Sequence, residues 1–129
     1  MTVRLERGTV VLVDLDPNVG HGQKSVRPCV VVSDPMVATD QRYPLVGVVS
    51  LTGPEGRGAL YPKLPASAGG LRKDSWALTD QLRSIDKRRI VAAYRVLDPA
   101  SIEAIDEGLR LFLGLGPASG PDASLTAWL

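Results

Sequence analysis

Hydrophobic residues occur in short runs along most of the chain, and turn-forming residues separate the runs. The runs are rich in Val, Ile, Leu and aromatic residues, whereas Gly, Pro, Asn and Asp cluster between them, which is typical of β-strands joined by turns. Pro62 indicates that the strand containing it lies at a sheet edge. One helical turn is expected within residues 34–42. The predicted strands are residues 10–15, 29–33, 45–51, 59–64, 74–79 and 90–97.

The hydrophobic period changes after the last predicted strand. Residues 98–113 place apolar side chains at helical spacing and charged side chains opposite, which predicts a helix with Asp98 as its N-cap. Gly108 costs about 1 kcal/mol relative to alanine inside a helix, so we expect the packed face to stabilise it. Gly114 ends the helix. The apolar face consists of Ile102, Ile105, Leu109, Phe112 and Leu113.

These elements predict a mainly β protein with a C-terminal helix, an α+β arrangement. Several short strands with close turns favour a small curved barrel or sandwich, with the helix over one opening. We expect one domain over residues 1–115. Residues 116–129 are rich in Gly, Pro, Ala and Ser, which predicts a flexible C-terminal tail.

Composition adds several expectations about the class of protein. No apolar run approaches the roughly 20 residues that cross a bilayer, and the first seven residues lack a signal-like apolar core, so we expect a cytoplasmic protein without membrane contact. One cysteine and one histidine cannot build a zinc site, so neither metal nor cofactor is expected. The net charge of +1 conceals an asymmetry, because residues 20–95 hold twelve Lys and Arg against six Asp and Glu. This excess either attracts a polyanion or reflects an ordinary solvated surface.

Several short sequence blocks are spread over residues 7–114. They are Arg7-Gly8-x-Val10, Val13-Asp14-Leu15-Asp16-Pro17, Gln23-x-x-x-Arg27-Pro28-x-Val30-Val31-Val32, Leu64-Pro65, Gly70-Leu71-x-x-Asp74-Ser75, and residues 80–90 and 105–110. Each block alone is weakly specific, but together and in this order they resemble the MazF/PemK family of toxins.

The resemblance implies a small SH3-like, PemK-type β-barrel that forms a homodimer. It further implies a metal-independent, sequence-specific endoribonuclease that cleaves single-stranded RNA. Attack by the RNA 2′-hydroxyl would leave a 2′,3′-cyclic phosphate and a 5′-hydroxyl. A cognate MazE-like antitoxin would neutralise the toxin by covering its RNA groove.

Two residues match the family's catalytic positions. Arg27 can hold two phosphoryl oxygens at once, and we expect it to stabilise charge and to be a candidate proton donor. The Thr52 hydroxyl can donate to a phosphoryl oxygen, although a threonine before Gly53 is also ordinary turn chemistry. The general base stays unassigned. His21 is one candidate because its pKa is ordinarily near neutrality, but a solvent-exposed loop residue is the favoured interpretation.

Five further residues are expected to bind RNA: Asp16, Gln23, Lys24, Gln81 and Arg83. The glutamine at 81 can read a base edge. The arginine at 83 has a structural alternative, which is an ion pair with one of the neighbouring aspartates at 80 and 86. The aspartate at 16 has one too, since it can steady its own loop.

Other conspicuous residues favour structural roles. Cys29 is expected in the core of a strand, not as a nucleophile, and Trp76 is expected to pack in the barrel. Residues 87–89, Lys-Arg-Arg, either follow RNA phosphates or form a solvated turn.

Two alternative functions fit the same fold. One is a toxin that binds and poisons a topoisomerase without catalysis, and the other is a degenerate homologue that only binds antitoxin. The recognised RNA sequence cannot be read from the chain.

Overall fold

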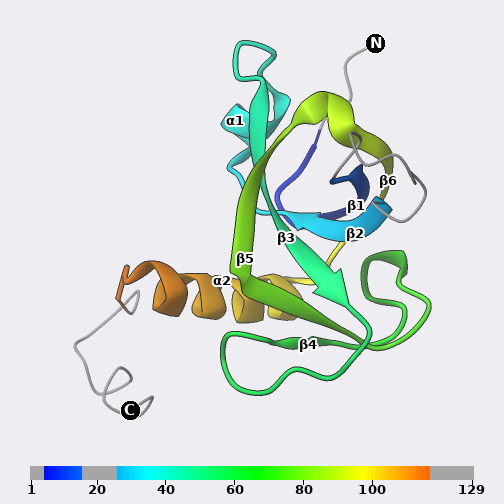
Figure 1. Cartoon of the computed structure of the whole chain (residues 1–129), viewed down its shortest axis with the longest axis vertical. Helices are drawn as coiled ribbons and strands as arrows, with labels where there is room; N and C mark the ends of the chain where they lie inside the picture. The colour runs from blue at the N-terminus through cyan, green and yellow to red at the C-terminus, as the bar shows by residue number, and fades with distance from the viewer. Residues whose placement is uncertain (1–4, 16–25, 117–129) are drawn as a thin grey trace.

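The computed structural model describes residues 5–15 and 26–116 (Figure 1). Within these ranges no helix has the length and apolar content to cross a bilayer. The elements in chain order are β1 (Thr9–Asp14), β2 (Val26–Val31), α1 (Pro35–Thr39), β3 (Leu45–Thr52), β4 (Lys63–Leu64), η2 (Ala68–Gly70), β5 (Ser75–Asp86), η3 (Lys87–Arg89), β6 (Ile90–Val96) and α2 (Pro99–Leu113).

The strands form one antiparallel sheet in the order β4-β5-β3-β2-β1-β6, which is strongly curled (Figure 1). The prediction of a curved, mainly β fold with a C-terminal helix is therefore confirmed. β2 begins at Val26, three residues before the expected start, and so includes Arg27 and Pro28. Pro28 is compatible with this strand because the ladder to β3 begins only at Cys29.

β5 is the longest strand and is interrupted by a bulge. Val49 of β3 pairs with Leu82, but the next residue, Ser50, pairs with Leu78, so residues 79–81 have no partner on β3. A bulge of this kind bends a strand, and β5 turns visibly at this point in Figure 1. The prediction that the strand stops at residue 79 was wrong, because pairing resumes after the bulge and continues to Asp86.

The expected strand over residues 59–64 is also corrected, because only Lys63–Leu64 pairs as a strand. The Tyr61 amide donates to the Gly58 carbonyl, which makes the preceding segment a turn. Its carbonyls still bind β5, since Leu60 accepts from the Thr79 amide at 3.1 Å.

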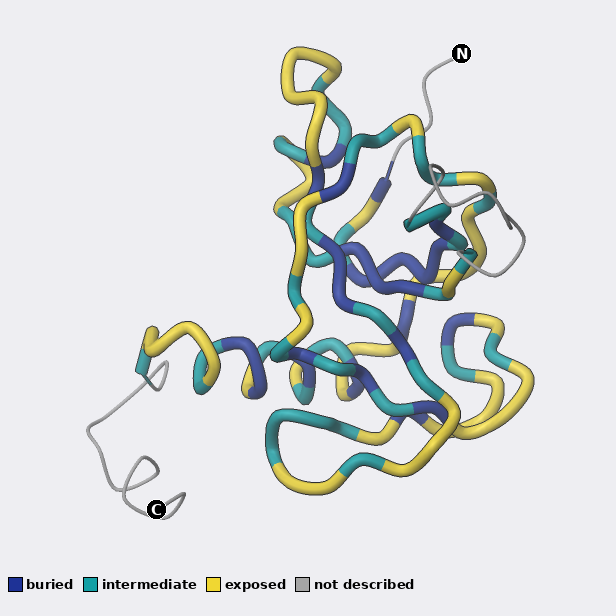
Figure 2. The backbone as a smooth tube through the Cα atoms, in the orientation of Figure 1, coloured by how far each residue is buried: buried dark blue, intermediate teal, exposed yellow. Residues whose placement is uncertain are grey.

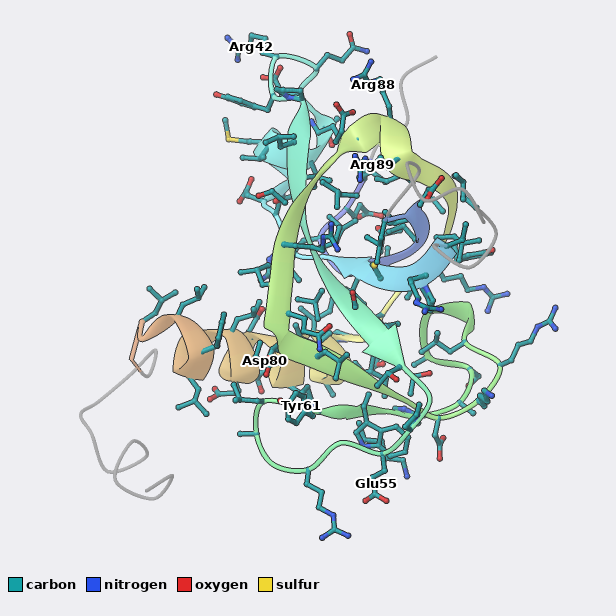
Figure 3. The ribbon with its side chains drawn as sticks, in the orientation of Figure 1. Arg42, Glu55, Tyr61, Asp80, Arg88 and Arg89 are labelled. Carbon is teal, nitrogen blue, oxygen red and sulfur yellow. The ribbon has the colours of Figure 1, made fainter. Side chains whose placement is uncertain are left out.

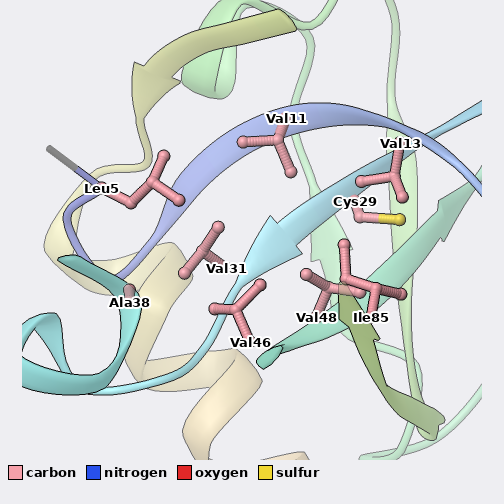
Figure 4. Close-up of a cluster of buried hydrophobic side chains, with 9 residues drawn as sticks. All are labelled: Leu5, Val11, Val13, Cys29, Val31, Ala38, Val46, Val48 and Ile85. Atoms are coloured by element: carbon pink, nitrogen blue, oxygen red, sulfur yellow. The ribbon is translucent and has the colours of Figure 1, made fainter. Parts of the chain in front are cut away.

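The central strands are covered on both faces. Adjacent residues of a strand point to opposite sides of the sheet, and in β1, β2 and β3 consecutive residues are buried. This explains the continuous valine runs in the sequence. A first cluster fills the inside of the curl (Figure 4). Its buried members are Leu5, Val11, Val13, Cys29, Val31, Ala38, Val46, Val48 and Ile85.

A second cluster lies between the other face of the sheet and α2. Figure 2 shows buried and exposed stretches alternating along α2. The buried members are Val10, Val30, Val49, Leu51, Leu64, Ala77, Leu97, Ile105 and Leu109. Ile102, Ile105 and Leu109 pack against the sheet as the sequence predicted. The prediction was wrong for Phe112 and Leu113, which are 46% and 48% exposed because the last turn of α2 extends beyond the covered part of the sheet.

The ends of α2 agree with the sequence. The Asp98 carboxylate accepts from the Ser101 amide at 3.2 Å and from its hydroxyl at 2.7 Å, which caps the helix. Gly114 ends the helix with a φ of 70°. The expected helical turn is α1, whose Asp34 N-cap accepts from the Met36 amide at 2.8 Å.

Candidate active site

A groove of about 790 Å³ crosses three neighbouring strands, at the start of β2, the end of β3 and the middle of β5. It brings together four residues that the sequence analysis selected from three separate blocks. The lining residues are Leu15, Arg27, Pro28, Ser50, Leu51, Thr52, Gly53, Pro54, Lys73, Ser75, Leu78, Gln81, Leu82 and Arg83. We call this space the polar groove.

Strand alternation explains why its polar side chains share one face. Cys29 of β2 pairs with Ser50 of β3. Because the strands are antiparallel, Arg27, two residues before Cys29, lies on the same side and at the same end as Thr52, two residues after Ser50. On β5, Gln81 and Arg83 alternate with Ile85, a member of the inner core cluster. The polar residues therefore lie on the same face of the sheet as the inner core cluster, next to the region that apolar side chains fill.

Arg27 is exposed at the start of β2 and Arg83 is exposed on β5. The ion pair proposed as an alternative for Arg83 is not formed. Asp80 instead accepts from the Tyr61 hydroxyl at 2.6 Å, and Asp86 is bound by Arg88. Within the described part of the chain neither guanidinium of the groove has a hydrogen-bonded or ionic partner. Both can therefore bind an anion without breaking an existing contact.

Three hydroxyl residues line the polar groove: Ser50, Thr52 and the buried Ser75. Thr52 is the last residue of β3, is half-buried and pairs with Trp76. Ser50 is also half-buried, and its Oγ lies 3.9 Å from Cys29 Sγ. Sequence reasoning missed Ser50. Its position two residues before Thr52 in a strand would have placed it on the same face.

The charge of the groove is one-sided. Arg27, Lys73 and Arg83 line it, and among the described residues no aspartate or glutamate does. Lys73 was not selected from the sequence, since it belongs to a polar segment between strands whose path the sequence does not reveal. Three cations beside hydroxyl and amide groups can bind successive phosphates of a single strand.

Cys29 is a core residue, as predicted. Its side chain is 0% exposed in the inner cluster. Burial raises the pKa of the Cys29 thiol, which the hydrogen bond to Ser50 and the charge of Arg83 only partly oppose. A thiol with a raised pKa is a poor nucleophile at neutral pH.

Trp76 and the basic run at residues 87–89 lie outside the polar groove. Trp76 is half-buried, not part of either core cluster, and its ring centroid lies 5.8 Å from Lys63 Nζ. Lys87 Nζ donates to the Val37 carbonyl at 2.6 Å, and Arg89 Nη1 donates to the Leu15 carbonyl at 3.0 Å. Figure 3 shows Arg88 and Arg89 at the turn between β5 and β6. These contacts favour the turn interpretation over phosphate binding.

Four residues named from the sequence, Asp16, His21, Gln23 and Lys24, lie outside the described residues. Their roles stay predictions. Among residues 5–15 and 26–116, no three His, Cys, Asp or Glu side chains converge in a way that would hold a metal ion.

Comparison with known proteins gives matches over nearly the whole chain. The family model described as "PemK-like, MazF-like toxin of type II toxin-antitoxin system" matches residues 6–113. The chain is 29% identical over 111 residues to endoribonuclease EndoA of Bacillus subtilis (strain 168), a match that covers 86% of this chain and 96% of the relative.

Solved structures show the same fold. MazF from Deinococcus radiodurans superposes with a TM-score of 0.66 at 26% identity, covering 87% of this chain and 98% of that one. A MazE–MazF complex of the same organism gives 0.70 at 23% identity, with 87% and 98% covered. An endoribonuclease in complex with its cognate antitoxin, from mycobacterial species, gives 0.69 at 21% identity, with 91% and 99% covered.

Proposed function

The chain belongs to the PemK-like, MazF-like toxins of type II toxin–antitoxin systems, and on this basis we propose that it is an endoribonuclease whose polar groove binds and cleaves single-stranded RNA. One observation carries the location of the site. Arg27, Thr52, Gln81 and Arg83, which come from three separate segments, line one groove to which residues 5–15 and 26–116 contribute no carboxylate. Such a groove is suited to a polyanion.

The RNA supplies its own nucleophile in the proposed reaction. The ribose 2′-oxygen loses its proton to a general base and bonds to phosphorus. The bond from phosphorus to the 5′-oxygen then breaks, and the leaving oxygen takes up a proton. The products are a 2′,3′-cyclic phosphate and a 5′-hydroxyl, so no water is consumed in this step.

Arg27 and Thr52 act on the charge that develops during this step. The exposed guanidinium of Arg27 binds two non-bridging oxygens in a planar fork, which stabilises the added negative charge. The Thr52 hydroxyl donates to the same phosphoryl group from the end of β3. Arg27 is also the candidate donor for the 5′-oxygen. A guanidinium keeps its proton at neutral pH, which makes it a poor base, so the general base is not assigned.

Gln81 and Arg83 bind the RNA beside the scissile phosphate. Gln81 is exposed within the bulge of β5, where its amide is free to pair with a base edge. Arg83 contributes a phosphate contact two residues further along the strand. We extend this binding role to Asp16, Gln23 and Lys24 of the segment between β1 and β2, on sequence grounds alone.

The proposed partners are a cognate MazE-like antitoxin and a second copy of the chain. The antitoxin is supported by the complexes formed by two structural relatives. The homodimer is supported by a second, largely apolar groove of about 780 Å³ between the sheet and the end of α2. Leu45 and Leu113 line it and are 49% and 48% exposed. Exposed apolar side chains of this kind favour burial against another protein surface.

The decisive test is cleavage of an end-labelled single-stranded RNA by the purified chain in the presence of EDTA. We expect fragments that end in a cyclic phosphate and begin with a 5′-hydroxyl. Arg27→Ala should lower the cleavage rate by at least about 100-fold, because a transition-state charge contact is lost. Arg57→Ala is the matched control, since Arg57 is exposed and lines neither groove.

The same assay separates the alternatives. A topoisomerase poison or a degenerate antitoxin-binding homologue would give no cyclic-phosphate ends with the wild-type chain. Full activity of Arg27→Ala would leave the nuclease intact but overturn the proposed role of Arg27.

A further inference from the structure

Lys73 lies on the wall of the polar groove next to the proposed catalytic residues. It is exposed and belongs to the segment that leads into β5, two residues before Ser75. A Cβ built on Gly53 would lie 3.9 Å from Lys73 Cε, so the lysine stem passes beside the turn that directly follows Thr52. This places its ammonium group at the end of the groove where β3 leaves the sheet.

The segment that carries Lys73 is held in place by its neighbours. The Ser75 hydroxyl donates to the Lys73 carbonyl at 3.2 Å. The Asp74 carboxylate accepts from the Ala66 amide at 2.9 Å and lies 3.3 Å from Lys63 Nζ. The backbone at Lys73 and directly after it is therefore held in place while the side chain lines the groove.

The charge of Lys73 is not neutralised within the described structure. The nearest carboxylate in sequence, Asp74, already pairs with Lys63. None of the residues that line the polar groove is acidic, and no ion pair of Lys73 occurs in residues 5–15 and 26–116. An uncompensated ammonium group in a groove is suited to a phosphate oxygen, for which lysine acts as a point charge.

We propose that Lys73 is a substrate-binding residue that contacts a backbone phosphate of the RNA next to the one held by Arg27. The inference rests on the proposed function and names one additional residue for it. The strand would then run across the groove past Thr52, held by Arg27 on the β2 side and by Lys73 beyond the end of β3. A lysine contact of this kind sets the position of the strand and adds affinity, and it does not read the base.

Arg72 provides a matched control within the same segment. It precedes Lys73, is equally exposed and carries the same charge, but it does not line the polar groove. Arg72→Ala and Lys73→Ala therefore change the net charge of the chain equally. Only the second removes a cation from the groove.

The experiment measures binding of a single-stranded RNA made uncleavable by a 2′-deoxy ribose at the scissile position, over a range of salt concentrations. Each phosphate contact to a single strand contributes about −0.7 to the slope of log affinity against log salt. We expect Lys73→Ala to make the slope shallower by about 0.7. If the two chains bind equally at 1 M salt, the variant then binds about fivefold more weakly than the wild type at 0.1 M salt. Lys73→Arg should restore the slope, and Arg72→Ala should keep that of the wild type.

Each outcome decides the question. Equal slope changes in Lys73→Ala and Arg72→Ala would mean that net charge alone acts, and an unchanged slope in Lys73→Ala would mean that no contact exists. Either result overturns the inference while wild-type cleavage still supports the proposed function. Failure of the wild-type chain to bind or cleave RNA would overturn both.

Discussion

Asp86 shows how the fold fixes a single carboxylate. It precedes η3, and its Oδ1 accepts from the Arg88 amide at 2.8 Å while its Oδ2 lies 3.0 Å from Arg88 Nη2. The hydrogen bonds to Arg88 lower the pKa of Asp86 to about 2. A carboxyl whose pKa is lower in the folded than in the unfolded chain stabilises the fold above the unfolded pKa of about 3.9. That stabilisation is lost as the pH falls toward 2.

We expect Asp86→Asn to lower the melting temperature at pH 6 and to have a much smaller effect near pH 2, where the wild-type carboxyl has lost much of its charge. The difference should be small, because Arg88 is 91% exposed and water and salt screen the pair. Thermal unfolding of both chains between pH 2 and pH 6 measures it. Glu55→Gln is the control, since Glu55 is exposed and has no ionic partner among the described residues. An equal difference at both pH values would contradict the assignment.

The residues of the polar groove differ in how far the sequence could predict them. Arg27, Thr52, Gln81 and Arg83 were selected by family resemblance, and the structure places all four on one groove, although their roles stay untested. Lys73 was missed because its approach to Thr52 depends on how two segments meet after folding. Whether residues 87–89 contact RNA or form a turn could not be decided from the sequence for a similar reason. Their carbonyl acceptors belong to residues far away in the sequence.

Elements with an uninterrupted hydrophobic pattern could be predicted from the sequence, whereas strands whose pairing is interrupted could not. β1, β3, β6 and α2 were predicted nearly to their ends, since each has a continuous apolar pattern and a clear turn or cap. β5 was cut short because the bulge at residues 79–81 breaks the period-two pattern. β4 was overextended because Leu60 binds β5 through its backbone without forming a ladder.

Gly108 in α2 reverses the expectation from helix propensity. A Cβ at this position would lie 2.7 Å from Thr79 Oγ1 and 2.9 Å from the Ala59 carbonyl oxygen. Thr79 cannot easily move away, because its hydroxyl donates to the Leu60 carbonyl at 2.6 Å. The glycine therefore permits the close approach of the helix to β5, which offsets its intrinsic cost.

Replacing this glycine by alanine should destabilise the protein. Propensity alone predicts a gain of up to about 1 kcal/mol for Gly108→Ala, but overpacking typically costs about 1–3 kcal/mol. We expect a lower free energy of unfolding by urea. Ala104→Gly on the same helix is the control and should also destabilise, by about 1 kcal/mol. A more stable Gly108→Ala chain would show that the contact with Thr79 relaxes without cost.

Across the whole molecule, β5 connects the two grooves. Leu82 and Arg83 line both the polar groove and the apolar groove beside the end of α2. The bulge directly before these residues bends β5, so that the strand borders both the polar groove and the apolar groove. A second copy seated on the apolar groove would therefore border the proposed RNA site. This makes the assembly state relevant to how Arg83 meets the substrate.

The homodimer proposal predicts that a charge in the apolar groove separates the copies. Leu113 is 48% exposed at the end of α2, so Leu113→Glu should leave the monomer folded while burying a carboxylate in a dimer that meets through this groove. We expect the dissociation constant of the dimer to rise at least about tenfold, a change of about 1.4 kcal/mol, as measured by sedimentation equilibrium. Circular dichroism would confirm that α2 persists.

Met36→Glu is the matched control, because Met36 is 78% exposed on α1 and does not line the apolar groove. It places the same charge on an exposed apolar position and should keep the wild-type dissociation constant. If the wild-type chain is monomeric at every concentration, the homodimer itself is wrong. If Leu113→Glu dimerises as tightly as Met36→Glu, the copies meet through another face, and the apolar groove is not the dimer interface.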